Sequence, residues 1–242
     1  AMNISVVVPA FNEEKLLSQT LERIQSALEA FHALGWGTEI VVCDNNSTDR
    51  TAALAQEAGA KVVFEPINQI SRARNRGAEA ASGDWLIFVD ADSHPSRELF
   101  AAVAREIQSG SCLAGGSTVR MDGAPLAARA VTALWNAISR AMRWCAGSFI
   151  FCEAKAFRQA GGFSLELFAS EEIDLSGKLK KLARQQGRRV VILRRHPLVT
   201  SARKLRLYSA RTHLRLLLRT LLRPTTTLRS REACGIWYDG KR

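Results

Sequence analysis

The stretch Trp85–Asp92 reads WLIFVDAD, and it decides the fold of this chain. Its five leading apolar residues predict a strand that is buried on both faces, and Ser93–Pro95 ends that strand. Asp90 and Asp92 therefore stand at the carboxyl end of the strand, which is where ligands bind in open α/β sheets. Hard cations such as Mg²⁺ and Mn²⁺ prefer carboxylate oxygens together with phosphate oxygens. The pair predicts a divalent-cation site facing a diphosphate, although such pairs also occur as turn residues.

The chain on both sides of this stretch alternates strands with helices, which predicts parallel βαβ units. In the first half we expect strands at residues 4–8, 39–43, 61–64 and 85–89, and helices at about 13–33, 48–58 and 71–81. In the second half we expect helices at 96–108, 125–143, 171–186 and 203–222, and strands at 112–120, 149–151 and 189–193. The predicted class is α/β, with a Rossmann-like, open, mostly parallel sheet flanked by helices.

Polar residues follow three of the expected strands. Pro9–Glu13 comes after the first strand, Asp44–Asp49 after the second and Asp90–Asp92 after the fourth. Each segment taken alone is also typical of a helix cap. Because parallel strands bring their carboxyl ends to one edge of a sheet, the three segments together favour a nucleotide site at that edge.

These segments resemble family 2 glycosyltransferases of the GT-A fold. The resemblance covers roughly residues 3–195 and rests on motifs at 6–14, 42–49, 73–77, 88–92, 161–163 and 171–175. It implies a catalytic domain over residues 2–200, with a nucleotide-sugar half at about 2–95 and an acceptor half at about 96–200. It also implies inverting transfer of a sugar from a nucleotide diphosphate donor, with Mn²⁺ or Mg²⁺. The Gln-x-x-Arg-Trp signature of processive synthases is missing, so we expect transfer of a single sugar.

The same resemblance implies roles on the nucleotide side. It places four residues in the nucleoside pocket: Pro9, Ala10, Asn12 and Glu13. Asp44 would accept a hydrogen bond from the base, such as the imide N–H of uracil, so a UDP-sugar is the favoured donor.

On the phosphate side, Arg74 would face the nucleotide and its phosphates, which suits a guanidinium; a solvated helix charge is the alternative. Asp90 would touch the ribose or the metal, and Asp92 would be the direct metal ligand. In some GT-A enzymes a histidine from the downstream region completes the metal shell. His196 is the candidate here, with a structural histidine as the alternative.

An acidic cluster, Glu171–Asp174, opens an expected helix, and the resemblance assigns it the general base. Glu172 stands where the family usually has its basic aspartate, and Asp174 is a rival. Glu171 is the third acid of the cluster, and repulsion between such close carboxylates raises a pKa, which suits a base. The alternative is a helix start enriched in acids because of the helix dipole.

The positive charge of the chain is concentrated at its C-terminal end. The net charge is +11, but residues 178–242 balance to +17 and residues 1–177 to −6. In the expected helix at 203–222, arginines recur every four residues, at Arg211, Arg215 and Arg219. A leucine stripe lies on the opposite face of this helix. This pattern in the extension 201–242 is typical of an interfacial helix on an anionic membrane, or of a helix packed on the core with a solvated basic face. Aromatic interleaving is absent, so we expect no nucleic-acid partner.

Composition narrows the class of protein further. A hydrophobic content of 47% and a charged content of 24% are ordinary for a soluble globular domain. The five cysteines include no Cys-x-x-Cys pair, which predicts reduced thiols rather than a zinc site. We see neither a signal peptide nor an apolar stretch long enough to span a membrane, so we expect a cytoplasmic location with peripheral contact at the inner face of the membrane.

Two rival functions remain at this point. A sugar-phosphate nucleotidyltransferase is also α/β and metal-dependent, but it would show a glycine-rich phosphate loop after the first strand, and Pro9–Glu13 is not one. A non-catalytic, membrane-recruited nucleotide-binding module would tolerate loss of the acidic cluster. Retention of both Asp90–Asp92 and Glu171–Asp174 favours the enzyme. The acceptor is unknown, and the basic extension points to a lipid-linked one.

Overall fold

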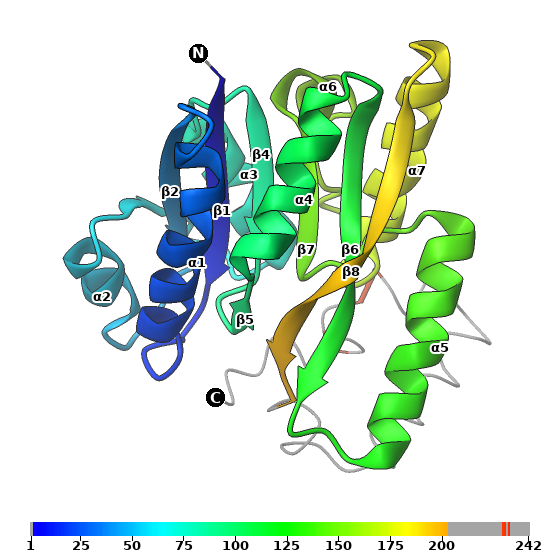
Figure 1. Cartoon of the computed structure of the whole chain (residues 1–242). Coiled ribbons are helices and arrows are strands. Elements are labelled where there is room, and N and C mark those ends of the chain that lie inside the picture. The colour runs from blue at the N-terminus through cyan, green and yellow to red at the C-terminus, as the bar shows by residue number, and fades with distance from the viewer. Residues whose placement is uncertain (1, 203–228, 231, 233–242) are drawn as a thin grey trace.

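The computed structural model describes residues 2–202, 229–230 and 232, in which an eight-stranded sheet is covered by helices (Figure 1). The elements of the first half are β1 (Asn3–Ala10), α1 (Leu17–His32), β2 (Gly37–Asp44), α2 (Thr51–Glu57), β3 (Lys61–Phe64), α3 (Ile70–Ala80) and β4 (Trp85–Val89). Those of the second half are β5 (Ser93–His94), α4 (Arg97–Gln108), β6 (Cys112–Asp122), α5 (Leu126–Met142), β7 (Phe149–Glu153), α6 (Ala154–Gln159), α7 (Glu171–Gln185) and β8 (Arg189–Ser201). The helix expected at 203–222 lies outside the described residues.

The strand order is β3-β2-β1-β4-β7-β6-β8-β5. In the first half β1 pairs in parallel with both β2 and β4, and β2 pairs in parallel with β3. The carboxyl ends of these strands therefore lie at one edge of the sheet, as the alternating pattern predicts. In the second half β7 runs antiparallel between β4 and β6, while β6 and β8 are parallel. The result is the mixed, mostly parallel sheet expected for a GT-A fold.

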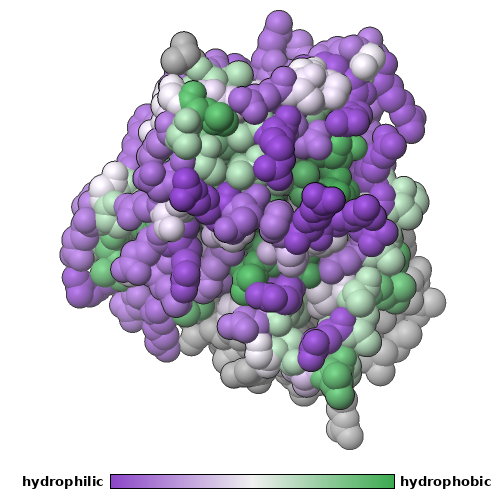
Figure 2. Space-filling model, viewed as in Figure 1, coloured by the Kyte–Doolittle hydropathy of each residue, from purple (hydrophilic) through white to green (hydrophobic). Residues whose placement is uncertain are grey.

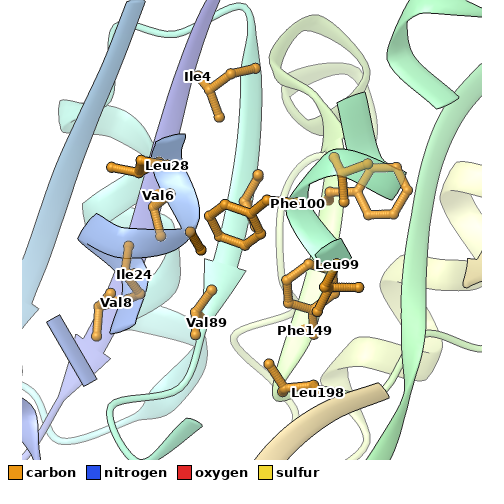
Figure 3. Packing of buried hydrophobic residues seen from close by; sticks show 14 of the residues in the cluster. Ile4, Val6, Val8, Ile24, Leu28, Val89, Leu99, Phe100, Phe149 and Leu198 are labelled. Carbon is orange, nitrogen blue, oxygen red and sulfur yellow. The ribbon is translucent and has the colours of Figure 1, made fainter. Parts of the chain in front are cut away.

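The two faces of the sheet carry separate hydrophobic clusters because successive strand residues point to opposite faces. Ile4, Val6 and Val8 of β1 face the layer that contains α1 and α4, where they pack with Ile24 and Phe100 (Figure 3). Val7 belongs to the opposite cluster, which includes residues of α3, α6 and α7. Strands buried on both faces explain why the sequence of β4 is uniformly apolar.

The predicted state of the cysteines can be compared with the structure directly. Cys43, Cys112, Cys145 and Cys152 are free and buried, as expected for reduced core thiols, and burial raises the pKa of each thiol.

The last expected strand, at 189–193, is longer than predicted: β8 continues to Ser201. Its register against β6 shifts between the pairs Ser117–Leu193 and Val119–Leu198. The intervening residues of β8 form an irregularity that accommodates a proline inside the strand.

Helix α3 packs against β1 through a glycine. A Cβ on Gly77 would lie 2.5 Å from Cγ1 of Val7, a fully buried side chain. Only the absence of a side chain at position 77 lets the helix approach the sheet this closely.

We predict that Gly77→Ala destabilises the protein by about 1–3 kcal/mol, because it overpacks a closed contact in the core. The matched control is Gly177→Ala in α7, where an added Cβ meets nothing within 4 Å. There the better helix propensity of alanine stabilises the protein by about 0.5–1 kcal/mol. Urea unfolding of both variants measures the two effects; equal and small changes would mean that α3 does not depend on this contact.

Candidate active site

The three predicted polar segments do lie at one edge of the sheet. Ala10 is the register partner of Asp44, and β4, which pairs with β1 on its other side, leads directly into Asp90. The carboxylate of Asp44 is almost completely buried, and its Oδ1 accepts a hydrogen bond from the backbone N–H of Ser47 at 3.1 Å. The segment after β2 is therefore folded back against the strand end that it follows.

The segments after β1 and β2 are held together by side-chain to backbone hydrogen bonds. The N–H of Asn12 donates to Oγ of Ser47 at 3.0 Å, and the N–H of Thr48 donates to Oδ1 of Asn12 at 2.8 Å. The N–H of Glu13 donates to Oγ1 of Thr51 at 2.8 Å. Asn12 has a φ of 52°, a left-handed conformation that asparagine tolerates better than most residues. These contacts make one rigid wall out of two loops that the sequence places far apart.

Arg74 of α3 is the residue to which the remaining segments of the site are bonded. Its side chain is buried, yet it carries a full charge, which is costly unless it is paired. Nη1 donates to Oε1 of Glu171 at 2.6 Å, and Nη2 donates to Oδ1 of Asp90 at 2.9 Å and to the carbonyl of Gly147 at 2.7 Å. Its guanidinium carbon lies 5.1 Å from the ring centre of Phe163, a cation–π distance. The arginine expected at the phosphates thus crosslinks four segments of the chain.

Two further side chains, one in α3 and one directly before it, hold the loop that precedes the acidic helix. Asn75 makes two hydrogen bonds to the backbone of Phe163, donating to its carbonyl at 2.9 Å and accepting from its N–H at 3.0 Å. Gln69, just before the helix, donates from Nε2 to the carbonyls of Leu165 and Leu167. Helix α3 therefore sets the position of α7 as well as that of Arg74.

A cavity of about 210 Å³ opens where these segments meet. It is lined by Arg74, Asp90 and Glu172 together with Ile70, Gly147, Ser148 and residues 168–171. Ser170, which precedes α7, has a φ of 63°, and such strain in a residue other than glycine is often found at functional sites. The cavity brings together Arg74, Asp90, Glu171 and Glu172, four residues for which the family resemblance suggests roles in the site.

Within the acidic cluster the structure separates the candidate bases. Burial, and then the neighbouring Glu171 carboxylate, raise the pKa of Glu172 to about 8. Asp174 lies away from the cavity lining and forms an ion pair with Lys178 at 2.8 Å, one turn further along α7. Glu171 is committed to Arg74. Of the three acids, Glu172 is the one that both lines the cavity and has a raised pKa.

The carboxylate pair after β4 lies in a short turn. The N–H of Ser93 donates to the carbonyl of Asp90, and Oγ1 of Thr20 in α1 donates to the carbonyl of Ala91 at 2.7 Å. Among the described residues, no cluster of three or more His, Cys, Asp or Glu could hold a metal by itself. A pair of carboxylates fits a cation that takes its remaining ligands from water and substrate phosphates, as Mg²⁺ commonly does.

His196 is not brought to this pair. It lies in β8 and lines a separate cavity of about 270 Å³ with Ala102, Arg105 and Glu106 of α4. His196 lies in the irregular stretch of β8 before Leu198, and Pro197 is the local feature of the sequence that marks this stretch.

The sequence also left several site residues unassigned. Gly147 and Ser148 line the cavity, and the carbonyl of Gly147 accepts a bond from Arg74. A Cβ on Gly147 would lie 3.4 Å from Nη2 of Arg74 and 3.5 Å from the carboxyl carbon of Glu172. No local pattern marks this glycine. Asn75 and Phe163 stand inside the family motifs, but their contact joins positions too distant in sequence to be predicted.

We predict that Arg74→Gln destabilises the protein by about 3–5 kcal/mol, because it leaves buried carboxylates without their cation. The control is Arg76→Gln on the same helix, whose ion pair with Glu79 is exposed and should contribute less than about 0.5 kcal/mol. Chemical unfolding of the two variants checks the difference. Similar small losses in both would show that Arg74 is not the crosslink described above.

A second prediction follows from the raised pKa of Glu172. The folded protein binds this proton more tightly than the unfolded chain, so the associated stability is present below pH 4.5 and is lost as the pH rises to about 8. Glu172→Gln removes this titration. The melting temperature of the variant minus that of the wild type should therefore increase across this pH window and level off above it. A difference that does not change with pH would contradict the raised pKa.

Comparison with known proteins adds to this geometry. The chain matches the family model described as Glycosyl transferase family 2 over residues 5–160. It is 36% identical over 121 residues to the dolichol-phosphate mannosyltransferase of Pyrococcus furiosus, and the aligned region covers 48% of this chain and 33% of that protein. It is also 36% identical over 135 residues to an undecaprenyl-phosphate 4-deoxy-4-formamido-L-arabinose transferase of Pseudomonas aeruginosa, covering 50% and 37%. The matches thus span only about a third of the length of these relatives.

Solved structures share the fold. Residues 1–349 of S. aureus TarS superpose with a TM-score of 0.65 at 20% identity, covering 84% of this chain and 61% of that chain. Glucosyl-3-phosphoglycerate synthase from Mycobacterium tuberculosis, solved with Mn²⁺, UDP and phosphoglyceric acid, gives a TM-score of 0.62 at 20% identity and covers 97% and 79%. At this identity the likeness shows the fold alone. The family match, which covers more than half of the chain, shows that the protein belongs to glycosyl transferase family 2.

Proposed function

We propose that this chain is a metal-dependent, inverting glycosyltransferase that moves one sugar from a nucleotide diphosphate donor, with a UDP-sugar favoured, to an acceptor hydroxyl that is lipid-linked. The observation that carries the proposal is the cavity in which Asp90 and Glu172 meet beside the Arg74 crosslink. A carboxylate at the end of β4 and a second carboxyl group with a raised pKa face the same space. Sugar transfer from a diphosphate to an acceptor hydroxyl uses that combination, a site for the metal and a base for the hydroxyl proton.

The nucleoside would lie on the wall formed by the loops after β1 and β2. The backbone of Pro9, Ala10, Asn12 and Glu13 borders it, and Asp44 would accept a hydrogen bond from the base. UDP is favoured because TarS has been solved with UDP-GlcNAc and the M. tuberculosis synthase with UDP. Asp44 at the end of β2 is buried beside Ala10, which suits recognition of a flat base through its edge.

Asp92 and Asp90 would hold Mn²⁺ or Mg²⁺ against the diphosphate. When bound there, the cation acts as a Lewis acid that stabilises charge on the departing diphosphate. The M. tuberculosis synthase has been solved with Mn²⁺ and with Mg²⁺, which supports this choice of metals. Asp90 has one oxygen committed to Arg74, so it would contribute through its other oxygen or through the ribose hydroxyls, and Asp92 is the direct ligand.

Glu172 would take the proton from the acceptor hydroxyl. Its pKa near 8 places it close to neutral pH, where a general base works best. The acceptor oxygen then attacks the sugar on the face opposite the departing diphosphate, which inverts the anomeric centre. Arg74 does not react in this scheme; it fixes Glu171, and so the first turn of α7, relative to Asp90.

A lipid-linked acceptor is supported by the two relatives that are named for dolichol phosphate and undecaprenyl phosphate. It would place the enzyme in the cytoplasm, at the inner face of the membrane. Those names also favour a second candidate, in which the acceptor atom is a phosphate oxygen rather than a hydroxyl. A phosphate monoester is already ionised at neutral pH, because its second pKa is about 6, and so it needs no base.

We predict that Asp92→Asn abolishes metal-dependent binding of UDP and leaves the fold intact, because Asp92 lies in the turn after β4, is only partly buried and is replaced by a side chain of the same shape. Calorimetric titration of UDP in the presence and absence of Mn²⁺ tests this directly. Asp84→Asn, also at an end of β4 but at the opposite edge of the sheet, is the control and should bind normally. Unchanged UDP affinity in Asp92→Asn with metal present would contradict the metal assignment.

We predict that Glu172→Gln leaves donor binding nearly unchanged and lowers turnover by about 10²–10⁴-fold, the usual share of general-base catalysis. Asp174→Asn, which removes the ion pair with Lys178, is the control and should have a much smaller effect. A larger effect of Asp174→Asn would transfer the role of base to that residue. A small effect of both, in a protein that still transfers sugar, would favour the phosphate acceptor; no transfer in the wild type would favour a non-catalytic module.

A further inference from the structure

Helix α5 turns several polar side chains and the partly buried Trp135 towards the protein, and most of its large aliphatic side chains towards solvent. Its buried residues are Thr132 and Ser139, both with hydroxyl groups. Asn136 fixes the helix to β6 by two hydrogen bonds with Val119, accepting from its N–H and donating to its carbonyl, each at 2.9 Å. This orientation is the reverse of the usual surface helix, which buries its apolar face.

The solvent side of α5 carries a continuous apolar stripe formed by Val131, Leu134, Ile138 and Met142. These side chains recur at intervals of three and four residues and so lie on one face of the helix. Val131 is 68% exposed and Leu134 is 63% exposed, and Leu126 in the first turn reaches 81%. Figure 2 shows hydrophobic residues gathered where Figure 1 places α5. Scattered exposed leucines need no explanation, but a stripe of this length indicates a binding surface.

The charged residues of α5 and of the segment that follows it all have the same sign. Residues 123–152 contain Arg129, Arg140 and Arg143 and no Asp or Glu. An apolar face bordered by arginines is the pattern of a helix that lies in the interface of an anionic bilayer. A second copy of this chain fits less well, because a symmetric contact between two α5 helices would bring like charges together without an acidic partner from this segment. Among the described residues, no helix has the length and hydropathy of a transmembrane span.

We propose that α5 is a bilayer-docking helix, whose apolar stripe enters the headgroup region while its arginines contact lipid phosphates. The helix has 17 residues, so it is about 25 Å long and lies flat on the membrane. The helix belongs to the part of the chain that the family model matches and not to residues 201–242.

The position of α5 couples such docking to the cavity. Lys180 of α7 donates from Nζ to the carbonyl of Met142, the last residue of α5, at 2.9 Å. Oγ of Ser176, also in α7, accepts from the N–H of Cys145 at 3.0 Å. The first turn of α7 carries Glu172, so a docked α5 holds the cavity next to the lipid surface. This last step rests on the proposed function, whereas bilayer binding itself does not.

The test is cosedimentation with vesicles of phosphatidylcholine alone and of phosphatidylcholine mixed with phosphatidylglycerol. The triple variant Val131→Ser, Leu134→Ser, Ile138→Ser should lower the partition coefficient on the mixed vesicles by at least about tenfold, because it removes three large apolar groups. Leu34→Ser with Phe64→Ser, which removes exposed apolar groups elsewhere, is the matched control and should bind as the wild type. Arg129→Gln with Arg140→Gln should weaken binding to the mixed vesicles only.

Two results would overturn the proposal. One is that the triple variant binds vesicles as strongly as the wild type does. Substitution of Arg211, Arg215 and Arg219 would then test whether those arginines are the source of binding. The other is a changed oligomeric state of the triple variant in sedimentation velocity with unchanged vesicle binding, which would make the stripe a contact between copies. UDP binding and circular dichroism show that the variants fold. Sugar transfer to a short, water-soluble acceptor without vesicles tests the proposed function separately.

Discussion

The buried guanidinium of Arg74 is the interaction on which the rest of the site depends. A charge removed from water loses several kcal/mol of solvation, and only well-placed partners offset this loss. Here the partners come from three other segments: Asp90 after β4, Gly147 before β7, and Glu171 at the start of α7. Any rearrangement that separates these segments leaves a buried charge unpaired. The same contact therefore stabilises the fold and fixes the walls of the cavity.

Helix α3 transmits this constraint to its surroundings. It lies close to β1 because Gly77 has no side chain, and its position then determines where Arg74 and Asn75 reach. The loop before α7 is attached to it at Phe163, so the acidic helix is positioned from the sheet outward. A site built in this way is held in place before substrate binds, which reduces the cost of reaching the reactive geometry. One carboxylate, Glu171, is paired with the arginine. Burial, and then this neighbouring Glu171 carboxylate, raise the pKa of Glu172.

The sequence predicts the parts of the fold that depend on local patterns. Apolar runs such as Trp85–Val89 and the acidic start of α7 were recognised because burial and helix capping leave a mark within a few residues. The partners of Arg74 were not recognised from the sequence, because Glu171 is 97 positions away and only packing brings the two residues together. For the same reason the sequence predicts the helix at 125–143 without indicating that its aliphatic side chains are turned outward. His196 was suggested as a metal ligand by the family resemblance alone, whereas in the structure β8 continues through it and it lines a separate cavity beside α4.

The most direct test of this account is a crystal structure of the protein with UDP and Mn²⁺. The account predicts that Arg74 keeps its bonds to Glu171 and Asp90, that the diphosphate and the metal lie against Asp92, and that Glu172 faces the space left for the acceptor. An Arg74 side chain that has left Glu171 and binds the diphosphate would contradict it, because the arginine would then be a substrate ligand and not the crosslink that holds the site together.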